Sequence, residues 1–317
     1  MESINDYINS NISGSVPWGK FLDEIKKSTV PRKPPTVKKQ SGKKKTIVIL
    51  GDHQAPYYDK DLHELTLAFV SDLKADGLIY TGDGPDFDSL GKHRAKPEFS
   101  SSAQEGLNTI HTILEEIVVA GKLKGKELIY IPGNHEIRLQ NKLLDILPSL
   151  FGIKRANVSD EELDVLHLAN LMRLPELGFE YITSDLGDYP HATYEVAPRF
   201  FVTHGWMSRK GGGNSARGSI ERLNGSLVTG HTHNLTVSYL TRWNGSTDPE
   251  VLTVAEAGTM ADARGLGYAR YPDWQNGFLV LNVLDGKTHL EPVIYKNREL
   301  RFRDQSWSKR KTFISKK

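Results

Sequence analysis

The sequence predicts an α/β fold, and within that class a four-layer αββα sandwich of two mixed β-sheets flanked by helices. Three observations lead to this prediction. Short apolar runs alternate with amphipathic helical patterns over residues 46–131, which is typical of βαβ units around a buried sheet. From residue 179 to residue 295, strand-like runs follow one another. Two sheets packed face to face would accommodate that many strands.

The alternating region is predicted element by element. Short apolar runs indicate strands, and apolar residues at helical spacing indicate helices. A further helix is expected to open near Ser159, because the run Ser-Asp-Glu-Glu resembles a capping box. The other predicted elements are, in chain order, a strand at 46–50, a helix at 60–75, a strand at 78–81, a helix at 102–120, a strand at 127–131 and a helix at 136–147.

In the second half of the chain the sequence predicts strands only. The residues before and after the predicted elements differ from them in composition. Residues 1–30 contain one helical piece at 18–27, and residues 31–45 are rich in proline and lysine without apolar periodicity, which marks a linker. The later strands are predicted at 179–183, 199–204, 226–231, 235–240, 251–258, 277–283 and 289–295. We therefore divide the chain into an N-terminal segment (1–30), a basic linker (31–45), one large domain (46–295) and a basic C-terminal tail (296–317).

Composition narrows the kind of protein. The chain has 317 residues, of which 38% are hydrophobic and 25% charged, as in ordinary soluble globular proteins. It has no cysteine, so disulfides and thiolate metal sites are excluded, and any metal must be held by His, Asn, Gln, Asp or Glu. No signal peptide and no membrane-length apolar segment is apparent. We expect a cytoplasmic protein without membrane association; the sequence makes no prediction of its oligomeric state.

Charge is unevenly distributed along the chain. Residues 30–51 contain seven basic residues and no acidic one, and residues 296–317 contain nine basic and two acidic residues. Because the whole chain carries only +2, the remainder carries −12. An acidic body with two basic flanks fits a metal site with arms that attract a polyanion such as nucleic acid, although solvated linker and tail segments have the same composition.

Five short blocks of metal-ligand residue types follow apolar runs. Asp, Asn and His supply the oxygen and imidazole donors that suit divalent ions. Open sheets with crossover helices bind ligands at the carboxyl ends of their strands, so these loops can converge on one site. Together they predict a metal-dependent hydrolase. The blocks are GDHQ (51–54), GDGPD (82–86), GNHE (133–136), HG (204–205) and GHTH (230–233).

In order and spacing, these blocks resemble the motifs of the calcineurin-like metallophosphoesterases, D-x-H, GDxxD, GNH[ED], H and GHxH. The resemblance covers about residues 46–290. Any single block is a weak signal, whereas five in order are specific. GDGPDFDSLGKHR followed by GNHEIRLQNKL is also similar to phage-encoded and other bacterial members with D-x-Q in the first motif. A phage-encoded protein would work in the host cytoplasm.

The resemblance implies two divalent metal ions, manganese first, with iron, zinc, magnesium or nickel as alternatives. A hydroxide between the ions would attack phosphorus. His135 would be the general acid or phosphate-polarising group, oriented by Asp86. Asp83 would bridge the ions. Asp52, Gln54 and His233 would belong to one ion, and Asn134, His204 and His231 to the other.

One position departs from the family pattern. Gln54 stands where the family has the histidine of D-x-H, and His53 is out of register by one residue. Neighbouring side chains point in opposite directions, so His53 is not expected to replace that ligand. Gln54 offers an amide oxygen, a weaker donor than imidazole for zinc but acceptable to manganese or magnesium. We expect weaker or more variable occupancy of this metal position.

Several residues near the motif loops are candidates for substrate binding. Arginine forks bind phosphate bidentately. The glycine-rich stretch 211–213 could be a mobile lid or only a flexible connection, and Glu256, Asp262 and Arg264 lie in a loop that could border the site. The candidates for contact with the substrate are His93, Arg94, Arg138 and Arg217.

The sequence leaves the substrate open among three functions. The first is a phosphodiesterase or nuclease acting on DNA, RNA or nucleotides, which the basic flanks favour. The second is a phosphomonoesterase, including a protein or small-molecule phosphatase, which would use the same ligands. The third is a nucleic-acid-binding accessory protein with a degraded site, of which Gln54 would be the first sign.

Overall fold

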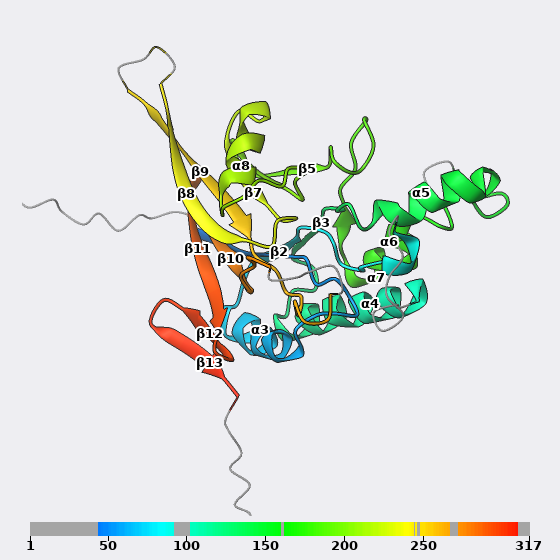
Figure 1. Ribbon diagram of the computed structural model, residues 1–317, viewed down its shortest axis with the longest axis horizontal. Helices are drawn as coiled ribbons and strands as arrows, with labels where there is room; N and C mark the ends of the chain where they lie inside the picture. The colour runs from blue at the N-terminus through cyan, green and yellow to red at the C-terminus, as the bar shows by residue number, and fades with distance from the viewer. Residues whose placement is uncertain are drawn as a thin grey trace, which may run out of the picture. The chain divides into compact units, whose positions relative to one another are not determined.

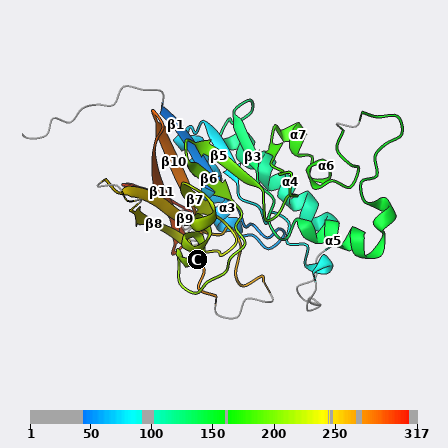
Figure 2. The ribbon, with the colours of Figure 1, turned by 90° about the horizontal axis from the view of Figure 1, so that it is seen from above.

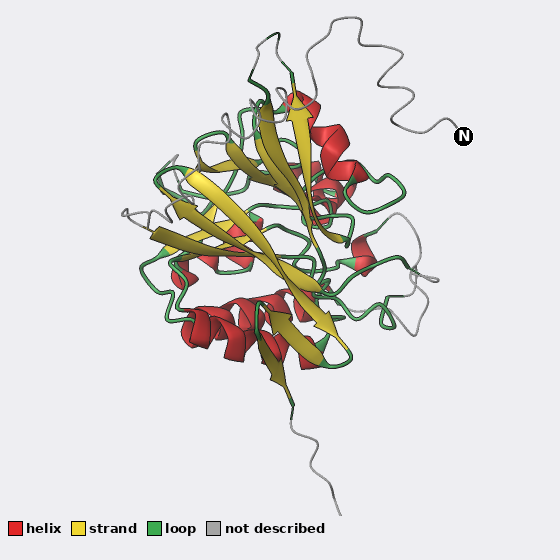
Figure 3. Cartoon of the chain, turned by 90° about the vertical axis from the view of Figure 1, so that its left-hand side faces the viewer, coloured by secondary structure: helices red, strands yellow, loops and turns green. Residues whose placement is uncertain are grey.

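The computed structural model describes residues 44–91, 102–159, 162–243, 245, 248–266 and 272–309. Within these residues the strands form an eight-stranded and a five-stranded mixed sheet. Figure 3 shows helices on the two outer sides and strands between them. The predicted four-layer α/β architecture is confirmed.

The larger sheet has the strand order β13-β12-β11-β10-β1-β2-β3-β4 (Figure 1). Strands β1 to β4 run parallel, and β10 joins β1 in antiparallel orientation. The parallel half therefore has all its carboxyl ends at one edge. The strands of the larger sheet are β1 (Lys44–Leu50), β2 (Gly77–Tyr80), β3 (Glu127–Tyr130), β4 (Glu180–Tyr181), β10 (Gly277–Leu284), β11 (Lys287–Lys296), β12 (Glu299–Phe302) and β13 (Gln305–Ser308).

The smaller sheet has the order β5-β6-β7-β9-β8. Strands β6, β7 and β9 are parallel, while β5 and β8 pair with their neighbours in antiparallel orientation. Its strands are β5 (Thr193–Ala197), β6 (Phe200–Thr203), β7 (Ser226–Thr229), β8 (Leu235–Arg242) and β9 (Glu250–Ala257).

Two long helices begin at side-chain caps. Asp59 accepts a hydrogen bond from the Leu62 amide, and Ser102 accepts one from the Glu105 amide, both at 3.0 Å; such caps satisfy amides that the first helical turn leaves free. The helices are α3 (Lys60–Leu73), α4 (Ala103–Ala120), α5 (Ile137–Ile146), α6 (Leu168–Leu171), α7 (Leu174–Leu177) and α8 (Asn214–Ser219), with 3₁₀ turns η1 (Asp88–Leu90), η3 (Pro148–Leu150) and η4 (Ile220–Arg222). None of these described helices is both long and apolar enough to cross a bilayer.

Alternation along β1 explains how the layers pack. Val48 and Leu50 face the helices α3 and α4, whereas Ile47 and Ile49 face the smaller sheet. Side chains of a strand point alternately to the two faces of a sheet, and both faces are apolar here because both are covered. Helix α8 covers the outer face of the smaller sheet through a separate cluster around Ile220.

The structure corrects the predicted helix near Ser159. Residues 162–167 form bends and turns, and the next helix starts only at Leu168. Ser159 accepts a backbone hydrogen bond from Glu162 through its carbonyl oxygen, which closes a turn that is not continued. The Ser-Asp-Glu-Glu run thus has the residue types of a capping box, but the residues that follow it do not form an amphipathic helix.

Two predicted boundaries also shift. Lys44 and Lys45, assigned to the linker, already belong to β1. Strands β5, β12 and β13 were not predicted, and the last two lie in the supposed tail, where Trp307 packs against Phe69 of α3 with ring centroids 5.0 Å apart. Frequent charges along residues 296–309 conceal this hairpin in the sequence. The predicted segment 1–30, its helical piece and most of the linker lie outside the described residues.

Candidate metal centre

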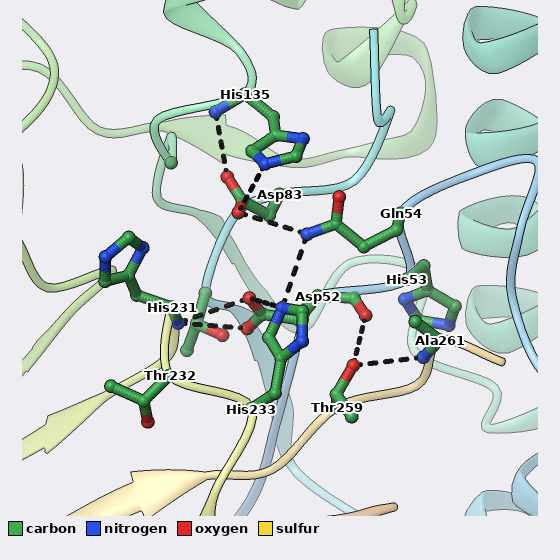
Figure 4. Close-up of polar contacts among 12 residues, drawn as sticks. Asp52, His53, Gln54, Asp83, His135, His231, Thr232, His233, Thr259 and Ala261 are labelled. Carbon is green, nitrogen blue, oxygen red and sulfur yellow. Dashed lines mark hydrogen bonds and ion pairs between the residues drawn. The ribbon is translucent and has the colours of Figure 1, made fainter. Parts of the chain in front are cut away.

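The five sequence blocks meet in space. They occupy the loops after β1, β2, β3, β6 and β7, whose carboxyl ends lie at neighbouring edges of the two sheets. The first two loops are joined by hydrogen bonds from the Asp52 amide to the Gly82 carbonyl (2.9 Å) and from the Gln54 amide to the Asp83 carbonyl (3.1 Å). Figure 4 shows side chains from the loops after β1, β2, β3 and β7 pointing toward one another.

Backbone conformation at the site is unusual. Five of the residues predicted as metal ligands lie in the left-handed region, which non-glycine residues adopt at an energetic cost. This conformation turns each side chain out of the strand direction and toward the shared centre. The five residues are Asp52 (φ 53°), Gln54 (52°), Asp83 (51°), His231 (70°) and His233 (61°).

Two groups of possible metal ligands share one carboxylate. Asp83, His204 and His231 form one group, and Asp52, Asp83 and His233 form the other; in each group, the potential ligand atoms lie within 4.8 Å of one another. All these side chains are buried except the half-buried His231. A carboxylate shared by both groups is what two adjacent dications require, because a bridging anion offsets their mutual repulsion.

Asn134 joins the group of His204 and His231. Its amide oxygen Oδ1 lies 2.7 Å from Nδ1 of His231 and 3.1 Å from Nε2 of His204. The neighbouring Gly133 packs so tightly that a Cβ atom there would stand 2.2 Å from Asp83 Oδ1. Glycine is therefore required at this point for the third loop to approach the shared carboxylate.

Gln54 lies in the other group, next to the shared carboxylate. Its amide nitrogen donates to Asp83 Oδ2 at 3.1 Å and lies 3.4 Å from His233 Nε2, while its Oε1 is buried without a hydrogen-bond partner. A half-turn of the amide would exchange oxygen and nitrogen. Gln54 donates to Asp83, and with its amide turned it could offer its oxygen to an ion instead.

His53 points away from the cluster, as expected for a residue one position out of register with Gln54. Its Nδ1 lies 2.8 Å from the Tyr80 hydroxyl, and the two rings stack with centroids 5.5 Å apart. The His53 side chain thus belongs to the helix-facing core and does not substitute for a ligand at position 54.

His135, Asp86 and Arg138 form a compact polar group beside Asp83. His135 Nδ1 lies 2.8 Å from the Asp86 carbonyl oxygen and 2.9 Å from its carboxylate Oδ1, and a single ring hydrogen serves only one of them well. Arg138 donates to the Asp86 carbonyl at 2.6 Å and approaches His135 Nε2 at 2.8 Å. Because arginine has no acceptor, this contact corresponds to a neutral ring with its hydrogen on Nδ1.

The pKa shifts at the site involve the shared carboxylate of Asp83 and the histidines around it. Burial opposes ionisation of Asp83, but the imidazoles of His135 and His204 outweigh it and hold the pKa of Asp83 well below its usual range. Burial likewise opposes protonation of His204 and His135, and the Asp83 carboxylate outweighs it, raising the pKa of His204 to about 10 and also raising that of His135. Burial and the nearby His204 lower the pKa of His231 to about 4. The lowered pKa of Asp83 and the raised pKa of His204 thus have the same cause, the attraction between this carboxylate and this imidazole.

Glu136 is a residue whose importance the motif alone did not reveal. Its buried carboxylate accepts hydrogen bonds from the Asp83 amide (3.0 Å), the Gly84 and Gly133 amides (both 2.8 Å) and the Tyr130 hydroxyl (2.6 Å). Four donors compensate the burial of the charge. Glu136 thereby fixes the second and third loops to each other. The only sequence signal was its place in the GNHE block.

The other candidate residues are not gathered at the cluster. Arg217 lies on α8 and donates to the Tyr239 carbonyl at 3.3 Å, and none of its contacts in the described part of the chain involves a ligand residue. His93 and Arg94 lie outside the described residues. Residues 211–213 lead into α8, whose first amides are capped by Glu256. Asp262 pairs with Arg264 on the surface.

Aromatic residues flank both ligand groups. Trp274 contacts the His233 ring edge to face at a centroid distance of 4.2 Å, and Tyr189 contacts His204 in the same manner at 5.8 Å. Both side chains are half-buried. Each ligand group thus has one aromatic neighbour that restrains an imidazole and borders the approach to it.

The residues present fit a pair of divalent ions. The donors are carboxylate oxygen, imidazole nitrogen and amide oxygen, which suit manganese, iron, zinc or magnesium, and a buried acceptor of Gln54 has no other partner among the described residues. Two helix-flanked mixed sheets with an Asp/His cluster at the strand ends are the arrangement that the sequence motifs led us to expect.

Comparison with known proteins adds relatives from phages. No family model matches the chain. It is 24% identical to the Gene 54 protein of Mycobacterium phage D29 and 23% identical to the Gene 54 protein of Mycobacterium phage L5, in each case over 269 residues, 79% of this chain and 92% of the relative.

Similar solved structures include the following three. Vacuolar Protein Sorting 29 from Cryptosporidium parvum matches with a TM-score of 0.41 and 17% identity, covering 84% of this chain and 99% of that chain. A single mutant of Vps29 from Entamoeba histolytica (TM-score 0.34) and TT1561 of Thermus thermophilus (0.32) are each 12% identical and cover 79% of this chain and 99% of their own.

Proposed function

We propose that this protein is a metal-dependent phosphoesterase, and specifically a phosphodiesterase that acts on nucleic acids or nucleotides. The observation that carries the proposal is the pair of Asp/His groups that share Asp83 beside the His135 imidazole. A phosphoryl centre needs both charge neutralisation and a proton donor for the leaving oxygen. The cluster offers residues for both tasks.

The ligand roles follow from the two groups. Asp52, Gln54 and His233 would hold one ion, Asn134, His204 and His231 the other, and Asp83 both. When bound, the ions would polarise the phosphoryl group and lower the pKa of a water molecule. Glu136 and Gly133 keep the loops close enough for the shared carboxylate to serve both groups.

His135 is assigned the proton transfer. Its Nδ1 is held by Asp86, so Nε2 is the nitrogen left for the substrate. Arg138 lies against Nε2, and its guanidinium prefers a charged phosphate to a neutral imidazole. Substrate would draw Arg138 onto the phosphate oxygens. Without the guanidinium, which lowers the pKa of His135, the ring would take up a proton on Nε2 and could give it to the leaving oxygen.

The choice of nucleic acid or nucleotide as substrate is supported by two features. Trp274 and Tyr189 border the two ligand groups, and aromatic rings stack on bases. The flanks are basic, but the described part of the C-terminal flank is largely neutralised, because Arg298 and Lys309 pair with Asp61, and Arg303 pairs with Glu291. The attraction to a polyanion would therefore come from residues 32–43 and 310–317.

Turnover of paired substrates tests the proposal. With manganese, magnesium, zinc or no metal, we would compare an aryl phosphodiester, an aryl phosphomonoester, and single- and double-stranded DNA. We expect metal-dependent turnover with preference for the diester and for DNA. Asn134→Ala and His204→Ala should each lower turnover at least about 100-fold, whereas Asn108→Ala, on the exposed face of α4, should not.

The alternatives predict different results. A phosphomonoesterase would prefer the monoester under every metal. A nucleic-acid-binding accessory protein, an alternative that the Gln54–Asp83 hydrogen bond favours, would bind DNA undiminished and show no turnover with any metal. Either result would refute the phosphodiesterase proposal.

A further inference from the structure

The segment after the third motif loop has no core of its own. We call residues 140–159 and 162–167 the α5 arm. None of its side chains is buried, although seven large apolar ones are exposed to between 38% and 66%. Figures 1 and 2 show α5 standing apart from the two sheets. The seven exposed residues are Leu144, Ile146, Leu147, Phe151, Ile153, Leu163 and Val165.

The α5 arm is folded back on itself. The Val165 amide donates to the Ile153 carbonyl at 2.8 Å, and Arg155 pairs with Glu162. Its connection to the body lies at its ends, where Leu139 packs on the main core and Leu168 is buried in it. A helix of ten residues is not stable in water without packing of its apolar face. The arm therefore has the shape of a folded element whose packing partner lies outside the described chain.

We propose that this partner is the α5 arm of a second copy of the chain. The seven exposed fractions correspond to on the order of 600 Å² of large side chains, close to the roughly 800 Å² that each member of a stable pair buries. The patch is therefore of the right size to be covered by its own copy. An exposed apolar area of this size on one element lies at the upper end of the roughly 300–600 Å² that the largest patch of a typical monomer reaches.

Helical spacing suggests how two arms meet. Leu144 lies in the last turn of α5, and Leu147, three residues later, is the C-terminal capping residue whose amide still donates to the Leu143 carbonyl, so the two side chains are neighbours at the end of the helix. An antiparallel two-fold pairing places Leu144 of one copy against Leu147 of the second copy, and the reverse. Isologous contacts of this kind use the same patch twice. The described arm has three basic and three acidic residues, so net charge does not oppose the pairing.

Sedimentation of the full chain tests the proposal. We expect a species with twice the 35.5 kDa mass of the chain. The double variant Leu144→Asp, Leu147→Asp should shift it to monomer and raise the dissociation constant at least about 100-fold. The matched control is Leu186→Asp, which changes an isolated side chain that is 76% exposed and lies outside the arm; it should stay dimeric. Thermal melting curves, monitored by circular dichroism, check that each variant is folded.

Cysteine cross-linking tests the orientation, because the natural chain has no cysteine. Leu144→Cys protein mixed with Leu147→Cys protein should give a disulfide-linked heterodimer in high yield, and each variant alone should give little. A full-length chain that is monomeric at tens of micromolar overturns the proposal, including a monomer whose arm resists proteolysis or binds lipid vesicles. Efficient cross-linking of either variant with itself overturns the antiparallel pairing.

Discussion

At the scale of single residues, the amide of Gln54 is the part of the cluster most open to experiment. It is the one departure from the family pattern, and it lies against both Asp83 and His233. Its neighbour His53 is committed to Tyr80 and does not compensate. One side chain therefore governs how well half of the centre can hold an ion.

We predict that Gln54→His raises the affinity for zinc about tenfold or more, since imidazole is the stronger donor for this metal. Isothermal titration of the metal-free protein would measure the change. Gln104→His, on the exposed side of α4, is the control and should leave zinc affinity as it is. An unchanged affinity of the Gln54 variant would mean that position 54 takes no part in metal binding.

Glu136 determines whether the second and third loops stay together. Glu136→Gln keeps the size of the side chain but turns an acceptor of four hydrogen bonds into a mixed donor and acceptor. We expect the free energy of unfolding to fall by about 2–4 kcal/mol, measured by urea denaturation. Glu115→Gln, on the exposed face of α4, should change it little. Equal stability of the two variants would show that the carboxylate is dispensable.

At the scale of elements, the C-terminal hairpin is held to α3 by charges around one carboxylate. Asp61 accepts hydrogen bonds from Lys309 (2.6 Å) and Arg298 (2.6 Å). These bonds lower the pKa of Asp61 below its ordinary value of 3.8. A carboxylate with a lowered pKa in the folded state stabilises the fold above its unfolded pKa, and this stabilisation is lost as the pH falls through the folded pKa.

We therefore expect Asp61→Asn to lower the melting temperature near neutral pH, and the difference from the natural chain to shrink as the pH falls below 3.8. Melting curves across this range would measure it. Asp285→Asn, in the turn between β10 and β11, is the control, because the structure describes no ion pair at Asp285. A difference independent of pH would assign the effect to packing.

Elements differed in how far the sequence revealed them. Strands β1, β2 and β3 and helices α3 and α4 were predicted because the apolar runs and helical spacing that mark them are local properties of the sequence. Strands β12 and β13 were not, because Trp307 and Phe302 gain their meaning only from contact with Phe69 of a distant helix. The convergence of the five loops was predictable from strand ends, but the four-donor role of Glu136 depends on three-dimensional proximity.

At the scale of the whole molecule, basic residues are concentrated near the two ends of the sequence, outside the five metal-ligand blocks. We predict that removing residues 1–43 and 310–317 weakens DNA binding and reduces its salt dependence, since each lost phosphate contact lowers the slope by about 0.9 for duplex DNA. Filter binding between 50 and 200 mM salt, roughly the range in which such contacts are lost, would measure it. The aryl diester, which has no phosphate chain, should be turned over at the natural rate; an unaltered salt slope would remove the flanks from the proposal.

The left-handed backbone of the ligand loops has a consequence for how this protein can change. His231 and His233 have a left-handed backbone conformation that is unfavourable for residues with a side chain. A metal ligand at these positions therefore lowers the stability of the folded protein. We expect His231→Gly to be about 1 kcal/mol more stable than His231→Ala in the metal-free protein, with the order reversed at Asn134, where φ is not positive. Chemical denaturation of the four variants would decide it. In a related protein that no longer needed the metal ions, glycine at these positions would be the simplest substitution that increases the stability of the fold.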